Sequence, residues 1–320
     1  MNTTILAPIV LFVYNRPWHT KQCLEALAKN ELAEQSTLFI YSDGPPDNAT
    51  ADQLQKIQEV RDLIREKKWC KDVVITEQPK NNGLANSVMK GVTEIVYKHG
   101  KVIVLEDDLV TSKFFLKFMN DGLEFYENVE EVISVHGYVF PVKRKLPETF
   151  FLKGADCWGW ATWKRGWDLF REDAFSLLEE VKQKNIKNEF DFGGAYPFFD
   201  TLQKQADKEI DSWAIRWYAS AFLKNKLTLY PAKSLIANIG QDGKGTHSGK
   251  TKIFDTPLVK KSISIKSIPI EENKKAFSII HPYYKLVSAG YEPPEKTFKI
   301  IKNKIMNSFF IQELNKFIKS

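Results

Sequence analysis

The sequence predicts an α/β protein in which an open, mostly parallel, twisted sheet of the Rossmann-like kind carries helices on both faces, with a helical tail at the C-terminus. Two observations predict this class. Short β-branched runs alternate with amphipathic segments through the first 130 residues, which is the pattern of βα units wound into a parallel sheet. The composition is that of an ordinary globular chain, with 43% hydrophobic and 27% charged residues among 320.

The N-terminal elements follow one another without long gaps. Each predicted strand is a short apolar run that stops at polar or turn-forming residues, whereas each helix has apolar residues three or four positions apart. The predicted strands cover residues 7–14, 37–42, 72–77 and 102–105. The predicted helices cover residues 18–29, 48–68, 84–97 and 113–126.

After about residue 130 the regular alternation is lost. Further strands are predicted at residues 132–136, 227–230 and 234–238, and helices at residues 177–187 and 211–224. An aromatic stretch fills residues 150–170, and glycine-bearing loops are expected at residues 191–195 and 240–249. The chain is therefore divided into one domain over residues 1–250 and a C-terminal extension over residues 251–320.

The extension ends in a basic, amphipathic segment at residues 295–320. Its apolar residues share one helical face and its lysines lie opposite. Two interpretations stay open, a helix packed on the core or an interfacial helix on an anionic membrane.

The bulk properties exclude several classes of protein. The net charge of +6 comes from lysines dispersed through most of the chain, whereas a nucleic-acid surface needs a concentrated patch. Three cysteines without a CxxC pair argue against a disulfide framework and structural zinc, and they favour a reducing cytoplasm. No apolar run reaches the ~20 residues of a membrane span, and a strand predicted from residue 7 leaves no room for a signal peptide. A cytoplasmic protein is expected.

The run at residues 101–110 (KVIVLEDDLV) carries the strongest functional signal. A buried strand is followed at once by Glu106, Asp107 and Asp108. Ligands of open α/β sheets collect at the carboxyl ends of strands, and adjacent carboxylates there repel one another unless a cation joins them. Mg²⁺ or Mn²⁺, which takes oxygen ligands and shares them with substrate phosphates, fits best. A solvated acidic loop is the alternative.

Three other strand ends carry polar residues of matching chemistry. The first strand ends at Tyr14-Asn15-Arg16 and the second at Asp43, and the third leads to a turn containing Lys80 and Asn82. Each has an ordinary explanation as a surface charge or turn residue. Together they describe a site for a nucleoside diphosphate and a metal. No GxxxxGK[ST] loop and no GxGxxG follows a strand, which excludes a P-loop protein and disfavours dinucleotide binding.

The ordered set of motifs across residues 5–250 resembles a glycosyltransferase of the GT-A fold, and more narrowly the N-acetylglucosaminyltransferase I group of inverting enzymes with its bacterial relatives. The residues that carry the resemblance are Asn15-Arg16, Asp43, Glu106-Asp107-Asp108-Leu109 with Phe114-Phe115, Gly159-Trp160, Asp211-Ser212-Trp213 and the loop at residues 240–249. It implies a donor half at about residues 1–130 and an acceptor half at about residues 131–250. The last 70 residues lie outside it.

The resemblance implies a donor role for each matching residue. Asp108 would coordinate the Mn²⁺ or Mg²⁺ ion directly. Asp107 would bind the ribose or sugar of a UDP-sugar, and Glu106 would hold a sugar hydroxyl. Asp43 would read the uracil, with Arg16 beside it.

It also implies a catalytic base and a closing loop. Asp211 would take the proton from the acceptor hydroxyl, although at the start of a helix it could equally be a structural N-cap. Lys244, Thr246 and His247 would close over the diphosphate. Trp213 could form an apolar platform beneath a sugar ring, as could Trp158 or Trp160. The segment around Asp211 lacks the second acid of the animal enzymes, and the chain lacks their membrane anchor.

These observations predict a metal-dependent inverting glycosyltransferase that moves N-acetylglucosamine or a related hexose from a UDP-sugar to a glycan or lipid-linked glycan. A peripheral position at the inner face of a membrane is expected from the basic tail. A sugar nucleotidyltransferase and a non-catalytic sugar- or nucleotide-binding scaffold are the alternatives. His19, His99, His136 and His281 form no pair with metal-ligand spacing and are expected to be incidental, while Trp163 and Trp167 are expected in the core.

Overall fold

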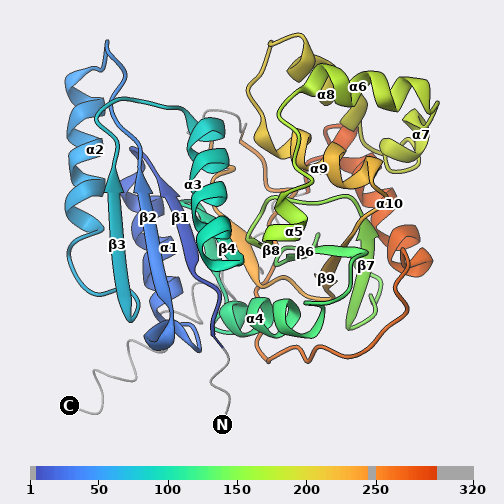
Figure 1. The fold of residues 1–320 in the computed structure, drawn as a ribbon, viewed down its shortest axis with the longest axis horizontal. Coiled ribbons are helices and arrows are strands. Elements are labelled where there is room, and N and C mark those ends of the chain that lie inside the picture. Colours follow the sequence, from blue (N-terminus) through green and yellow to red (C-terminus); the bar gives the residue numbers. More distant parts are fainter. Residues whose placement is uncertain (1–4, 244–249, 294–320) are drawn as a thin grey trace.

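The computed structural model describes residues 5–243 and 250–293. Eight strands form one continuous sheet in the order β3-β2-β1-β4-β8-β6-β9-β7. Figure 1 shows the N-terminal strands on one side of the sheet and the later strands on the other. The strands of this sheet are β1 (Ile9–Val13), β2 (Thr37–Ser42), β3 (Asp72–Glu77), β4 (Lys101–Glu106), β6 (Val132–His136), β7 (Thr149–Lys153), β8 (Trp160–Trp163) and β9 (Leu227–Pro231).

The directions of the strands bring several carboxyl ends to one edge. β1, β2, β3 and β4 are parallel to their neighbours, whereas β8 is antiparallel to both β4 and β6. Because β8 runs opposite to both of its neighbours, β6 runs in the same direction as β4. β9 is parallel to β6. The carboxyl ends of β1, β2, β4, β6 and β9 therefore share one edge, where open α/β sheets bind ligands.

Helices cover both faces of the sheet because its central strands are apolar on both sides. In β1, Ile9, Leu11 and Val13 pack toward α1, α2 and α4, whereas Val10 and Phe12 pack toward α3, α5 and α9. All five residues of β1 are buried, as expected for a strand enclosed on both faces. These helices are α1 (Pro17–Ala28), α2 (Ala51–Leu63), α3 (Leu84–His99), α4 (Phe115–Phe125), α5 (Lys164–Trp167) and α9 (Trp213–Leu223).

A small second sheet lies beside the carboxyl end of β4. After a two-residue turn, β5 (Leu109–Thr111) pairs with β10 (Ile236–Asn238) in antiparallel register. Because β10 follows the later strands in the sequence, this pairing ties residues more than 120 positions apart to the acidic turn. The loop after β10 is thereby brought over the edge of the main sheet.

The remaining helices pack at the far side of the sheet, above β7 and β9 in Figure 1. Ala276, Ile279 and Ile280 of the last helix lie in one buried cluster with Phe150 and Leu152 of β7. The C-terminal extension predicted from residue 251 thus contributes to the core in its described part, and its boundary stays a prediction. These helices are α6 (Ala174–Gln183), α7 (Lys187–Phe190), α8 (Phe198–Ala206) and α10 (Lys274–Ser288), whereas the short 3-10 helix η1 (Ala33–Gln35) lies between α1 and β2 in the sequence and packs with them.

The predicted fold class is confirmed, and each strand and helix predicted by residue range has a counterpart. Seven elements within the first 250 residues were not predicted as such: the strands β5, β7 and β8 and the short helices η1, α5, α7 and α8. The strand β4 extends further than predicted, so Glu106, which was expected to follow the strand, is its last residue. Among the described residues, no helix combines the length and the apolar character needed to cross a membrane.

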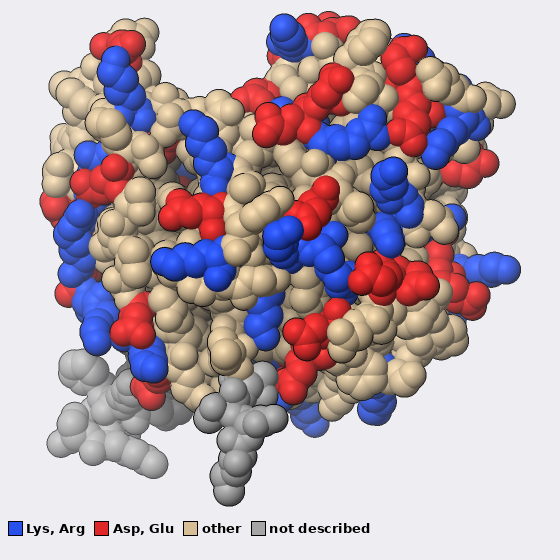
Figure 2. Space-filling model, in the orientation of Figure 1, with Lys and Arg blue, Asp and Glu red and all other residues tan. Residues whose placement is uncertain are grey.

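The surface shows no segregation of charge on the face drawn in Figure 2, where lysine and arginine lie interspersed with aspartate and glutamate. The outline is hollowed at the top, between the N-terminal half and the region of α6 and α8. The loop from β3 to α3 crosses at this level in Figure 1, so the hollow lies at the edge where the parallel strands end.

Candidate active site

The centre of the candidate site is the turn between β4 and β5. Glu106 ends β4 opposite Phe12 of β1, and Asp107 and Asp108 form the turn. Asp107 is 8% exposed, so its carboxylate is largely removed from water. The pairing of β5 with β10 fixes the far end of this turn, and the Asp108 carbonyl accepts a hydrogen bond from the Ile239 N–H at 2.9 Å. Two sheets therefore hold three adjacent carboxylates in place.

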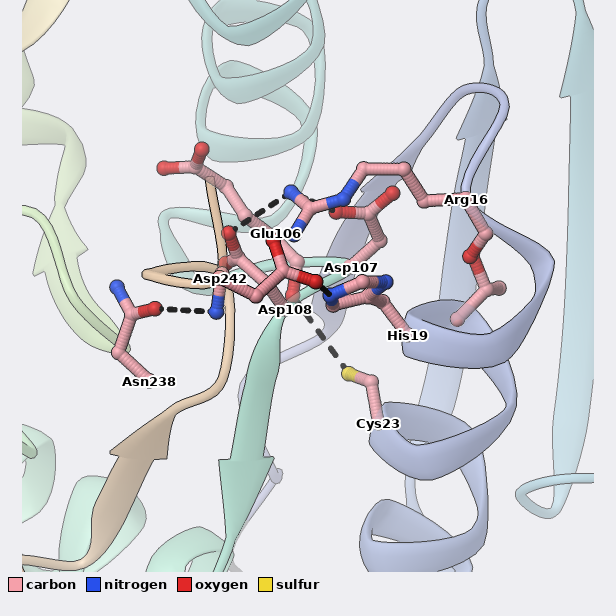
Figure 3. Close-up of polar contacts among 10 residues, drawn as sticks. Arg16, His19, Cys23, Glu106, Asp107, Asp108, Asn238 and Asp242 are labelled. Carbon is pink, nitrogen blue, oxygen red and sulfur yellow. Dashed lines mark hydrogen bonds and ion pairs between the residues drawn. The ribbon is translucent and has the colours of Figure 1, made fainter. Parts of the chain in front are cut away.

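Arg16 supplies the positive charge that faces these carboxylates. It is the N-cap of α1, and Pro17 at the first helical position begins the helix directly after it. Its Nη1 lies 3.0 Å from Asp108 Oδ2 and 3.5 Å from Asp107 Oδ1. Figure 3 shows the guanidinium extending from α1 toward the acidic turn. Its Nε and Nη2 are buried and make no hydrogen bond within the described residues, so two donors are aimed into the site without a protein acceptor.

The electrostatic balance of this group is negative. Burial raises the pKa of Glu106 well above its usual value, and the charges of Asp108 and Asp107 raise it further. Burial and the charge of Asp108 likewise raise the pKa of Asp107, against the opposing effect of Arg16. One guanidinium does not neutralise three carboxylates. The site therefore favours a further cation or bound protons.

Gly240 closes the site from the side of β10. A Cβ atom at this position would lie 1.9 Å from Asp108 Oδ2, so only glycine permits the observed approach of the backbone. The Gly240 N–H donates to Asn238 Oδ1 at 2.8 Å, which fixes the start of the loop. Two residues later, Asp242 Oδ2 lies 3.2 Å from His19 Nε2 of α1. The loop after β10 thus begins in contact with both the carboxylates and α1.

The donor set has the chemistry that Mg²⁺ or Mn²⁺ prefers. The available ligands are carboxylate oxygens, and burial, followed by the charges of the neighbouring carboxylates, raises the pKa of Glu106 and Asp107. A divalent ion would offset the negative charge of this group. The described residues contain no complete cluster of three or more ligating side chains. Such a site suits an ion held by one or two carboxylates and completed by substrate phosphates. Asp108 lies at its centre.

Asp43 organises the turn that follows β3. Its Oδ1 accepts from the N–H groups of Gly44 and Asn82, both at 2.9 Å, and its Oδ2 accepts from Gly83 N–H at 3.0 Å and Asn81 Nδ2 at 3.1 Å. These four bonds occupy the acceptor positions of the carboxylate. The structural role of Asp43 is thus clear, and its role in reading a uracil stays a prediction.

The other predicted donor residues lie at the same edge with different degrees of exposure. Tyr14, Asn15 and Asn82 are half-buried. Burial and the nearby Asp43 raise the pKa of the Tyr14 hydroxyl. The side chain of Lys80 is 77% exposed and lies 3.5 Å from Asp47, so it is the least constrained of the set.

Asp211 precedes α9 and does not cap it. The N-cap is Ser212, whose side chain accepts from the Ile215 N–H. The Asp211 carboxylate is 58% exposed and accepts from Arg216 Nη2 at 2.9 Å. It borders a hollow of about 520 Å³ that is lined by Gln205, Lys208, Glu209, Ile210 and Asp211. The alternative interpretation of Asp211 as an N-cap is therefore wrong.

The prediction that Trp213 is a platform for a sugar ring is contradicted by its burial. Its ring is 3% exposed and stacks on Trp160, with ring centroids 5.5 Å apart. Trp160 is fully buried, so it cannot serve as a platform either. Trp167 joins the same aromatic core, and Trp163 is also buried, as predicted for both. Trp158 is half-buried and packs edge-on against Tyr138.

Some predicted residues lie outside the described part of the chain. They are Lys244, Thr246 and His247 of the glycine-rich loop, and the basic segment at residues 295–320. The two ends of the loop are described and lie together: Asp242 and Lys250 form an antiparallel bridge, and the Thr251 N–H donates to the Gln241 carbonyl.

Several residues at the site were not predicted. His19 was expected to be incidental but contacts Asp242, and the Cys23 thiol lies 3.6 Å from the Glu106 carbonyl. Asn238 fixes Gly240. The helical spacing of four places His19 and Cys23 on one face of α1, and this spacing was the available signal. Nothing in the sequence connected that face with residues beyond 230.

No protein-family model matches the chain, and no curated protein matches its sequence. Among solved structures it is similar to S. aureus TarS 1-349, with 13% identity and a TM-score of 0.39 over 72% of this chain and 59% of that one. It is also similar to mouse xyloside xylosyltransferase 1 in its apo form, with 10% identity and a TM-score of 0.35 over 69% and 81% of the two chains. It is similar as well to GalNAc-T7 with UDP, GalNAc and Mn²⁺, with 12% identity and a TM-score of 0.39 over 72% of this chain and 43% of that one.

The chain thus spans less than two thirds of the TarS chain. Similarity at this level assigns neither a family nor an activity to the protein.

Proposed function

We propose that the protein is a metal-dependent inverting glycosyltransferase that uses a UDP-sugar, with N-acetylglucosamine or a related hexose as the transferred group. The observation that carries the proposal is the placement of Glu106, Asp107 and Asp108 opposite Arg16 at the carboxyl end of β4. This arrangement offers carboxylate ligands for a divalent ion and unpartnered guanidinium donors for a phosphate within one site. A diphosphate with its metal needs both.

The donor half of the reaction uses the acidic turn. Asp108 is the proposed ligand of Mg²⁺ or Mn²⁺, which supplies Lewis-acid stabilisation of the departing diphosphate when it is bound. Asp107 binds the ribose or sugar and Glu106 holds a sugar hydroxyl. Arg16 donates to the phosphate oxygens from Nε and Nη2, the two atoms without a partner in the described residues.

The nucleoside would extend from this point toward β1 and β2. Tyr14 and Asn15 line that side, and Asp43 reads the uracil through the turn that it holds. Lys80 and Asn82 border the same turn. Lys244, Thr246 and His247 are proposed to close over the diphosphate.

Transfer of the sugar requires removal of one proton from the acceptor and replacement of one bond at the anomeric carbon by another. Asp211 accepts the proton from an acceptor hydroxyl as the hydroxyl oxygen forms a bond to the anomeric carbon. The bond from that carbon to the phosphate oxygen breaks, and UDP leaves with the electron pair. A positioned base of this kind typically contributes about 10²–10⁴-fold in rate. The partial exposure of Asp211 and its hollow leave room for an acceptor.

The proposed acceptor is a glycan or a lipid-linked glycan. The basic amphipathic segment at residues 295–320 would hold the enzyme at an anionic membrane surface, at the inner face of a membrane. A cytoplasmic location fits the sparse cysteines, and all three are free thiols in the structure.

The first experiment is a calorimetric titration of the protein with UDP-, GDP- and CMP-sugars, in Mn²⁺ and in chelator. Mn²⁺-dependent binding of one UDP-sugar is expected, and Asp108→Asn should abolish it. Asp121→Asn is the matched control, because Asp121 is a carboxylate on α4 that pairs only with Lys117 in the described structure. Binding that is absent with every nucleotide sugar, or unchanged in Asp108→Asn, would refute the proposal.

A further inference from the structure

A second group of polar side chains lies at the same edge of the sheet, away from the acidic turn. His136 ends β6 and is fully buried, yet neither ring nitrogen makes a hydrogen bond within the described residues. Its Nε2 lies 3.6 Å from Asp156 Oδ2, beyond hydrogen-bonding distance. Burial lowers the pKa of His136, so the ring is neutral near pH 7. A neutral imidazole has both a donor and an acceptor to satisfy.

Tyrosine rings pack beside His136, and the side chain of the neighbouring Asp156 is 32% exposed. Tyr230 packs edge-on against the His136 ring with centroids 5.1 Å apart. Tyr196 and Tyr284 pack against each other at 5.3 Å. Ring contacts connect Tyr284 with His136, because Phe140 lies 4.9 Å from Tyr284 and 5.4 Å from Tyr138, and Tyr138 lies 6.5 Å from His136. Burial raises the pKa of the three hydroxyls, and the charge of Asp156 is a smaller cause in each case.

The hydroxyls of these tyrosines differ from those of their neighbours. Tyr138 donates to the Phe254 carbonyl at 2.8 Å, and Tyr218 donates to the Phe190 carbonyl at 2.7 Å. The hydroxyls of Tyr196, Tyr230 and Tyr284 make no hydrogen bond with the described residues, and they are not among the buried polar atoms, so they reach solvent. Buried polar groups in native proteins almost always have partners. The buried His136 imidazole without a partner therefore needs another explanation than packing, and the three tyrosine hydroxyls, which reach solvent, are available to bond a ligand.

The position of this group relates it to the candidate active site. β8 alone separates β6 from β4 in the sheet, and β6 and β4 point the same way. Cys157, next to Asp156, has its pKa raised by burial and by the charges of Asp156, Glu106 and Asp108. The two groups are thus electrostatic neighbours at one edge. Asp156, Tyr196 and Tyr284 are each partly exposed, so the group is open to solvent.

Aromatic faces combined with hydroxyl, imidazole and carboxylate groups have the chemistry of a sugar site. Aromatic rings cover the apolar face of a pyranose, and the polar groups exchange hydrogen bonds with its hydroxyls. A carboxylate accepts from two hydroxyls, while tyrosine and neutral histidine both donate and accept. A phosphate is disfavoured, because the only charge in this group is that of Asp156.

We propose that His136, Asp156, Tyr196, Tyr230 and Tyr284 form the subsite that binds a pyranose ring of the acceptor through its free hydroxyls. This inference rests on the proposed function, and it names the acceptor class and the surface that recognises it. Asp156 is the principal acceptor of hydrogen bonds from the sugar. His136 and the tyrosines fix the orientation of the ring.

The test is saturation-transfer NMR with a panel of methyl pyranosides, namely the methyl glycosides of glucose, galactose, mannose and N-acetylglucosamine. The full chain is used with and without UDP and Mn²⁺. At least one glycoside should receive saturation from the protein. Asp156→Asn should weaken its binding about tenfold or more, and Tyr284→Phe or Tyr230→Phe by about 2–10-fold, from the lost hydrogen bonds.

Tyr218→Phe is the matched control. It removes a hydroxyl from the same aromatic region, but this hydroxyl is already bonded to the Phe190 carbonyl. It should lower the midpoint of thermal unfolding and leave glycoside binding unchanged. Tyr284→Phe and Tyr230→Phe should leave the unfolding midpoint unchanged, since their hydroxyls have no described partner. These conservative variants keep the test decisive if Asp156→Asn does not fold.

Titration of UDP-sugars on the same samples separates the two proposals. Donor binding without any glycoside binding, or glycoside binding that Asp156→Asn and both tyrosine variants leave intact, overturns the subsite. Glycoside binding that these variants weaken, on a protein that binds no nucleotide sugar, overturns the acceptor role and the proposed function but keeps a sugar site. Donor binding together with weakened glycoside binding in the variants supports both.

Discussion

Arg16 is the residue whose removal has the clearest electrostatic consequence. It is the one cation that contacts Asp107 and Asp108 in the described structure, and its side chain is 18% exposed. Arg16→Met should abolish binding of a UDP-sugar and lower the free energy of unfolding by about 2 kcal/mol at pH 8. Chemical unfolding should show a smaller loss at pH 5, where the carboxyls with raised pKa are protonated.

Arg65→Met is the control for that substitution. Arg65 also pairs with a carboxylate, Glu77, but its side chain is 49% exposed, and exposed pairs contribute little. A loss of stability that is equal at pH 5 and pH 8 for Arg16→Met would contradict the account of the acidic turn.

The raised pKa values of Glu106 and Asp107 predict how stability depends on pH in chelator. The folded chain keeps protons on these groups at pH values where the unfolded chain, with pKa values near ~4, has lost them. Their contribution to stability is therefore complete below about pH 4 and is lost as pH rises through the raised values. Mn²⁺ should restore stability at pH 8 and release protons on binding.

Comparison with Glu106→Gln isolates this effect from other titrating groups. The glutamine mimics the protonated acid, so the difference in unfolding free energy between the variant and the parent should shift in favour of the variant as pH rises from 5 to 8. A difference that does not change with pH would show that Glu106 titrates normally.

Substitution of Asp211 tests whether the protein is an enzyme or only binds a nucleotide sugar. Asp211→Asn should keep donor binding and lower the turnover number by about 10²–10⁴-fold, because only the proposed proton acceptor is lost. Asp207→Asn, in a nearby carboxylate that accepts from Gln203, is the control and should retain turnover. Full turnover in Asp211→Asn would exclude it as the base.

At the scale of elements, two adjacent residues at the start of α9 have different expected roles, Ser212 as the N-cap of the helix and Asp211 as the proposed base. Ser212→Ala removes the N-cap bond to Ile215 and should cost about 1 kcal/mol in the free energy of unfolding. Its turnover should stay near that of the parent, the reverse of Asp211→Asn. Thermal unfolding and initial rates of the two variants, measured together, test whether adjacent residues serve these separate purposes.

The β4–β5 turn and the loop after β10 act as one unit through Gly240. Gly240→Ala would place a methyl group against Asp108, so it should displace the carboxylate and weaken Mn²⁺-dependent donor binding by more than tenfold, with a stability loss of about 1–3 kcal/mol. Gly290→Ala, at a glycine with positive φ and open space around it, should cost stability without affecting the donor. Normal donor binding in Gly240→Ala would contradict the proposed packing.

The strands that the sequence did not predict were missed for different physical reasons. β8 (WATW) is buried at all four positions, so it has no polar alternation to mark it as a strand. β5 has three residues and exists only because β10 pairs with it. The strands β1, β2 and β3 were predictable because each combines β-branched residues with a clear stop at its end.

For the whole molecule, the order of the strands could not be read from the chain. The apolar runs indicated a parallel sheet, but the insertion of β8 between β4 and β6 depends on pairings between distant segments. The acidic turn and Arg16 could be predicted as candidate site residues because each lies just after the apolar run of a strand. His136 and Asp156 were not, because their proximity arises only when β6 and the segment after β7 meet in three dimensions.

The single strand between β4 and β6 also determines the distance between the ends of these two strands. Neighbouring strands lie about 4.8 Å apart, so the ends of β4 and β6 are separated by roughly 10 Å. The hydrogen bonds of β8 to β4 on one side and to β6 on the other hold that interval. The sheet would therefore fix the distance between the two proposed binding surfaces, and exchange of side chains at the end of β6 could change which molecule is bound without altering the distance to the end of β4.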